Sequence, residues 1–155
     1  MDLPVILREA LELQILEQDA ENAAGAVGKG VEEHGPLVMA GLLLEAAAVA
    51  LRRMVSITDE AFDVADLLTQ LTLDGAVPEH RLELLRDVLT NAAATAGGIR
   101  PSIEALQTRL GDQDLLFGAW LGLLTTLRVV SITIEATEAE VVEDLLLAFD
   151  LPDDE

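Results

Sequence analysis

Apolar residues recur every three or four positions along most of the chain, which is the spacing of an amphipathic helix. The first such stripe covers residues 3–23. We expect Asp2 to cap this helix, and Pro4 suits its first turn, where a missing N–H costs nothing. A glycine-rich stretch follows at residues 25–30 and is predicted to break the helix.

Two segments, residues 37–54 and 115–128, are apolar on nearly all faces and are predicted to be core helices. Glu45 interrupts the first and Arg128 ends the second. Because both apolar runs are shorter than the roughly 20 residues that cross a bilayer, we expect no membrane span. The β-branched residues 129–134 predict a short extended stretch after the second helix.

Shorter amphipathic segments flank the two apolar helices. Thr58 is expected to cap a helix that ends near residue 73, and Pro78 to open one that ends near residue 96. Residues 101–111 predict a further short helix before Asp112, which is expected to cap the second apolar helix.

The last helix has a clear starting signal. Thr137 and Glu140 match a capping box, and the helix is expected to end near Phe149, before an acidic tail at residues 151–155. The predicted fold class is therefore all-α: a helical bundle of six to seven helices that forms a single domain over residues 1–155.

The two halves of the chain resemble each other. The pattern Arg-x-Val-Ser-Ile-Thr at residues 53–58 recurs at residues 128–133, and other short identities keep the same order. This predicts an internal repeat, residues 1–77 and 78–150, made of two pseudo-twofold-related three-helix units. The two apolar helices would then pack together as a central pair.

Composition narrows the classes of function. The chain carries 29 acidic and 9 basic residues, a formal net charge of −20, yet 51% of it is apolar, which is too hydrophobic for a disordered acidic tail. This charge disfavours direct nucleic-acid binding and contact with anionic membranes, both of which need Lys and Arg. The absence of cysteine excludes disulfides, thiolate nucleophiles and cysteine-ligated metals. The first residues lack a signal-type segment, so we expect a cytoplasmic protein.

Acidic residues are concentrated in parts of the sequence that contain no basic residue. Nine acidic residues and no basic residue follow Arg128, and six acids separate Arg53 from Arg81. Such surfaces raise the association rate and selectivity for a basic partner. Adaptation of the whole proteome to salt would also explain the acidity, and both explanations are open. The first candidates for partner binding are Asp66, Glu138, Glu140, Glu143 and Asp144.

The leading functional hypothesis is a non-enzymatic, acidic helical interaction protein that engages a basic partner protein. It would act as an inhibitor, an immunity-type factor, a nucleic-acid mimic or an assembly chaperone. One alternative is a self-associating structural or assembly subunit. Another is a small-ligand-binding bundle with a pocket between the two apolar helices, near Glu45 and Trp120.

Glu45 is the acid whose surroundings are least obvious, because an unpaired carboxylate on an apolar helix is costly to bury. Four explanations are open: it faces solvent, pairs with an arginine such as Arg128, hydrogen-bonds while protonated, or lines a ligand cavity. Neither His34 nor His80 has a partner at metal-ligand spacing, and the glycines at residues 25–30 do not form a phosphate-binding loop. No catalytic residue, metal site or cofactor is predicted.

Overall fold

In a computed structural model, the residues that the structure describes are 3–58, 86, 90, 108 and 111–150. The two long ranges among them hold five α-helices and one π-helical turn, and no β-strand. The predicted all-α class is confirmed. Apart from residues 58, 86, 90, 108 and 111, the helices expected near residues 58–73, 78–96 and 101–111 lie outside the described residues, as do Asp66 and the acidic tail.

The N-terminal region folds differently from its prediction. Helix α1 (Leu3–Leu11) passes into a π-helical turn, η1 (Glu12–Leu16). A break in the helix then separates this turn from α2 (Ala20–His34). At the break Gln18 has a φ of 54°. Asp19 caps α2, since its carboxylate accepts a hydrogen bond from the Asn22 backbone N–H at 3.2 Å.

The predicted break at residues 25–30 is wrong, because α2 runs through all three glycines. Gly30 explains why one of them is tolerated. A Cβ atom at this position would lie 2.6 Å from Met39 Sδ and 3.1 Å from Ile6 Cγ2, so the glycine lets α2 approach α1 and the next helix closely. Tertiary packing therefore offsets the roughly 1 kcal/mol that a glycine costs within a helix.

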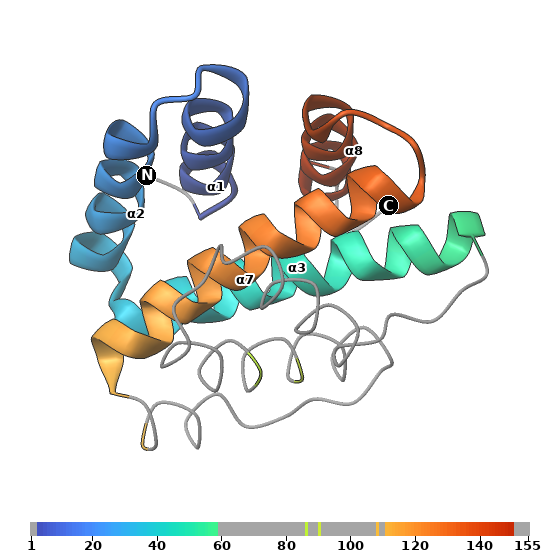
Figure 1. Cartoon of the computed structure of the whole chain (residues 1–155). Coiled ribbons are helices and arrows are strands. Elements are labelled where there is room, and N and C mark those ends of the chain that lie inside the picture. The colour runs from blue at the N-terminus through green and yellow to red at the C-terminus, as the bar shows by residue number, and fades with distance from the viewer. Residues whose placement is uncertain (1–2, 59–85, 87–89, 91–107, 109–110, 151–155) are drawn as a thin grey trace.

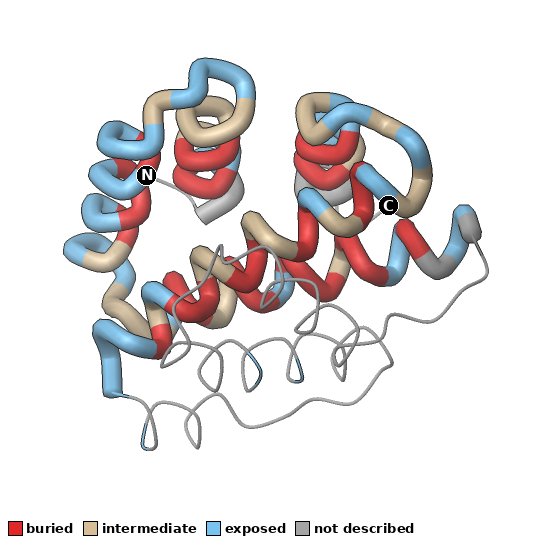
Figure 2. Tube along the Cα trace, viewed as in Figure 1, coloured by how far each residue is buried: buried red, intermediate tan, exposed pale blue. Residues whose placement is uncertain are grey.

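The two apolar segments form the long helices α3 (Pro36–Thr58) and α7 (Asp112–Thr133). They pack side by side, as predicted, and run in the same direction, so that their C-terminal ends lie at the same end of the molecule (Figure 1). Leu43 and Leu51 of α3 and Leu123 and Leu127 of α7 are fully buried. The buried residues of these two helices, red in Figure 2, follow the seam between them.

The extended stretch expected at residues 129–134 is wrong, because α7 remains helical through Thr133. The Ile134 backbone N–H donates to the Val130 carbonyl at 2.9 Å, and Val130 and Ser131 are buried. Burial of this last turn overrides the β preference of its residues. The N-cap of α7 is Gly111, with a φ of 84°, and not Asp112, which lies in the first turn.

Helices α1, α2 and α8 (Glu138–Asp150) cover one side of the α3–α7 pair (Figure 1). Helix α8 buries Val141, Val142, Leu145 and Leu146. The predicted capping box starts it: the Glu140 N–H donates to Thr137 Oγ1 at 3.1 Å, and the Thr137 N–H donates to Glu140 Oε1 at 3.4 Å.

Among the described residues, α7 is long and apolar enough to cross a bilayer, judged by length and composition. However, 56% of its most apolar 18-residue window is buried inside the protein. Because a buried core helix meets the same criterion, this is weak evidence for a span.

Candidate functional site: a groove beside acidic helix α8

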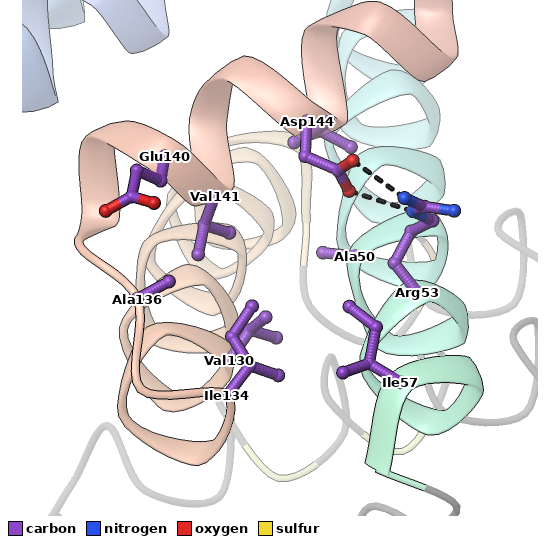
Figure 3. A pocket seen from close by; sticks show the side chains of 10 residues that line it. Ala50, Arg53, Ile57, Val130, Ile134, Ala136, Glu140, Val141 and Asp144 are labelled. Atoms are coloured by element: carbon purple, nitrogen blue, oxygen red, sulfur yellow. Dashed lines mark hydrogen bonds and ion pairs between the residues drawn. The ribbon is translucent and has the colours of Figure 1, made fainter.

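An open groove of about 200 Å³ lies where the C-terminal ends of α3 and α7 meet the first half of α8 (Figure 3). Helix α3 contributes its last two turns, α7 its end, and α8 the face that turns toward them. The residues that line the groove are Ala50, Arg53, Ile57, Val130, Ile134, Ala136, Glu140, Val141, Asp144 and Leu145.

The inside of the groove is apolar. Val130, Val141 and Leu145 are buried, whereas Ile57 leaves 58% of its surface exposed. Figure 3 shows Ile57 and Val130 facing each other across the groove. Pockets for whole small molecules usually measure about 300–1,000 Å³, so the groove suits a single apolar side chain better.

One ion pair closes the side of the groove where α3 meets α8. The Arg53 guanidinium donates two hydrogen bonds to the Asp144 carboxylate, from Nε to Oδ2 and from Nη2 to Oδ1, both at 2.8 Å (Figure 3). These hydrogen bonds, and then the attraction between the two charges, raise the pKa of Arg53 above its ordinary value. Arg53 therefore stays positively charged at any physiological pH, and both side chains remain accessible to solvent.

The predicted partner-binding acids on α8 do not all share one face. Glu140 and Asp144, one turn apart, both line the groove. Glu143 is exposed and follows Glu140 by three positions, so it extends the same face. Glu138 precedes Glu140 by two positions, which turns it toward a different side of the helix. Asp66 lies outside the described residues.

Glu45 faces solvent at the edge of α3, and its carboxylate accepts a hydrogen bond from Arg52 Nη2 at 3.1 Å. Two of the four explanations for Glu45 therefore hold together. It faces solvent, and it pairs with an arginine, which is Arg52 and not the suggested Arg128. The two residues lie seven positions apart, or two helical turns along the same side. Trp120 is partly buried against the core. Neither Glu45 nor Trp120 lines the groove, and a pocket beside them remains a prediction.

Sequence reasoning missed the groove, although it had identified two of its residues as binding candidates and Arg53 as part of the repeat. The sequence offered one sign that Ile57 lies in a binding groove. It is a large apolar residue near the end of a helix, one turn after Arg53. Within the part of the chain that the structure describes, no group of three or more His, Cys, Asp or Glu side chains could hold a metal ion.

Comparison with protein-family models, with curated proteins and with solved structures finds no match to this chain. The groove and the acidic face of α8 are therefore the features from which we infer a function.

Proposed function

We propose that this protein is a non-enzymatic binding protein that engages a basic partner protein through α8. The observation that carries the proposal is the grouping of Glu140, Glu143 and Asp144 on one helix face beside an apolar groove. Such a surface suits an inhibitor, an immunity-type factor, a nucleic-acid mimic or an assembly chaperone. In this proposal the protein works in the cytoplasm, does not span a membrane and does not bind nucleic acid directly.

The charge supports this function through its position as well as its size. A net charge of −20 gives the protein a negative potential that attracts a basic partner at long range. At short range, carboxylates beside an apolar surface set the orientation of the complex. The two effects together favour fast and selective association.

We also propose that the fold is an internal repeat with pseudo-twofold symmetry, built from residues 1–77 and 78–150. Two observations support it: α3 and α7 run in parallel, and they end on the same Ser-Ile-Thr sequence, at Thr58 and Thr133. In the aligned repeats Asp66 corresponds to Asp144, so the proposal gives the protein a second acidic ridge.

The function can be tested with a double variant, Glu140→Gln and Glu143→Gln, which removes two charges from the acidic face of α8. A glutamine at position 140 can still accept the capping-box hydrogen bond from the Thr137 N–H. The matched control removes two exposed acids elsewhere, through Glu17→Gln and Glu32→Gln.

Tagged forms of the wild type, the variant and the control are used to capture partners, and each captured protein is then purified and titrated. We expect a basic protein that binds the wild type and the control but is lost from the α8 variant. Its affinity should fall steadily as salt rises from about 0.05 to 0.5 M, because screening shortens the reach of the charges. A partner retained equally by all three forms, with an affinity indifferent to salt, would refute the proposal.

A second candidate function is self-association, favoured by three large apolar side chains that are more than half exposed in the part of the chain that the structure describes. These are Ile57, Ile132 and Leu147, at 58%, 68% and 63%. Sedimentation of the wild type and of an Ile132→Ser, Leu147→Ser variant tests it. Self-association predicts a mass that grows with concentration and that the variant reduces, whereas a monomer at every concentration eliminates it.

A further inference from the structure

The groove gives the proposed partner a more specific chemistry, and this inference rests on the proposed function. We propose that the groove binds a basic segment of the partner and takes up one apolar side chain of that segment. In the free protein, Arg53 occupies the position that a lysine or arginine of the segment would take. The partner's lysine or arginine would then meet Glu140 and Glu143, and compete with Arg53 for Asp144.

The apolar half of the inference comes from burial. Ala50, Val130, Val141 and Leu145 are buried and form a preformed apolar surface, while Ile57 at the mouth is left largely uncovered. An apolar side chain placed between Ile57 and Val130 would be removed from water on both sides. The gain scales with the apolar area covered.

The cationic half comes from the position of the charges. Glu140 and Asp144 lie one turn apart on the same groove wall. Arg53 already satisfies both Asp144 oxygens in the free protein. This pair is exposed, so solvent screens it and an incoming cation can exchange with it. Arg53 therefore competes with the partner and weakens its binding.

Charge complementarity selects this occupant over a second copy of the chain. A second copy would bring another net charge of −20 to a face that is already acidic, and the two would repel each other. A segment in which an apolar residue neighbours a lysine or arginine satisfies the apolar groove and the carboxylates at once.

The test uses random peptides displayed on phage and selected on the wild-type protein, followed by anisotropy titration of the enriched peptides. Ile57→Ser removes the large apolar side chain at the mouth of the groove. The matched control is Ile132→Ser, which removes the isoleucine at the corresponding place on α7, outside the groove. Both side chains are exposed, and thermal melting verifies that each variant folds.

We expect enriched peptides that place Leu, Ile, Phe or Met next to Lys or Arg. Ile57→Ser should weaken their binding about tenfold, equivalent to about 1.4 kcal/mol, and Ile132→Ser should leave it within about twofold. Arg53→Gln should tighten binding severalfold, because the internal competitor is gone, whereas Asp144→Asn should weaken it.

The outcomes separate this inference from the proposed function. Enrichment of basic peptides without apolar residues, or binding indifferent to Ile57→Ser, overturns the groove but leaves an acidic binding surface. Weaker binding by Arg53→Gln overturns the role given to Arg53. If the selection yields no basic peptides, the proposed function falls with the inference.

Discussion

Two glycines of α2 differ only in what lies beside them, and alanine at each position tests the packing of the N-terminal helices. Gly28 is exposed, and a Cβ atom there would have nothing within 4 Å. Gly30 is buried, and a Cβ atom there would lie 2.6 Å from Met39 Sδ, 2.8 Å from Met39 Cε and 3.1 Å from Ile6 Cγ2. The two substitutions therefore make the same chemical change in open and in filled space.

The magnitudes follow from two opposing effects. Replacing glycine by alanine within a helix stabilises it by about 0.8–1.0 kcal/mol, which is the full expected gain for Gly28→Ala. Gly30→Ala receives the same gain but overpacks the core, at a cost of about 1–3 kcal/mol, because Met39 and Ile6 are both buried and must move. We expect Gly30→Ala to be less stable than Gly28→Ala by about 1–3 kcal/mol.

Urea denaturation followed by circular dichroism measures this difference, and thermal melting should show it as about 2–4 °C for each kcal/mol. A double-mutant cycle adds a second readout. Met39→Ala makes room for the new methyl group, so Gly30→Ala should cost less in that background. If the two alanine variants are equally stabilised in the wild-type background, the end of the flexible Met39 side chain has moved aside at little cost, and the overpacking argument is refuted.

Three further substitutions test single features of α7 and α8 by the same denaturation assay. The Thr126 hydroxyl is buried and finds no hydrogen-bond partner among the described residues, so Thr126→Val should stabilise the protein by about 1–2 kcal/mol, unlike Thr125→Val at a less buried site. Glu135 has a φ of 56°, so Glu135→Gly should stabilise by about 0.5–1 kcal/mol, whereas Glu135→Ala should not. Thr137→Ala removes the N-cap of α8 and should cost about 0.5–2 kcal/mol, while Glu140→Gln should cost little.

Each of these expectations has a result that contradicts it. Loss of stability in Thr126→Val would mean that the hydroxyl is hydrogen-bonded. No gain from glycine at position 135 would mean that the turn between α7 and α8 is unstrained. An unchanged Thr137→Ala would mean that packing alone determines where α8 starts.

The helices themselves could be predicted because burial imposes a spacing that the sequence displays. The segments around Leu43 and Leu123 are apolar on nearly every side, and such helices need an apolar environment, which is the core in this structure. Helix ends were harder to predict. Gly30 looked like a breaker because the sequence does not show Met39 beside it, and Gln18 does not look like one, although it lies where the chain turns.

The candidate site could be predicted only in part, for a physical reason. The acids of α8 are visible as a charge pattern, and Glu140 is visible through its capping box. The groove depends on the register between α3 and α8, which brings Arg53 to Asp144 across 91 positions of sequence. No local pattern determines that register, because it follows from how both helices pack on α7.

The acids of α8 differ in how far the fold itself accounts for them. Glu138 and Glu140 lie in the first turn, where the helix dipole favours negative charge, and Asp144 is paired with Arg53. Glu143 is exposed beyond that turn, and among the described residues the structure gives its side chain no hydrogen bond or ion pair. Its charge is therefore the one on this face that folding explains least.

Glu143→Gln is accordingly the change that best separates binding from stability. Surface substitutions away from caps and ion pairs usually alter stability by less than about 0.5 kcal/mol, so its denaturation midpoint should match that of the wild type. Its binding of the basic peptides selected on the wild type should weaken, with a smaller dependence on salt. Equal binding by Glu143→Gln and wild type would show that Glu143 takes no part in binding a partner, and that its charge serves the solubility of the protein.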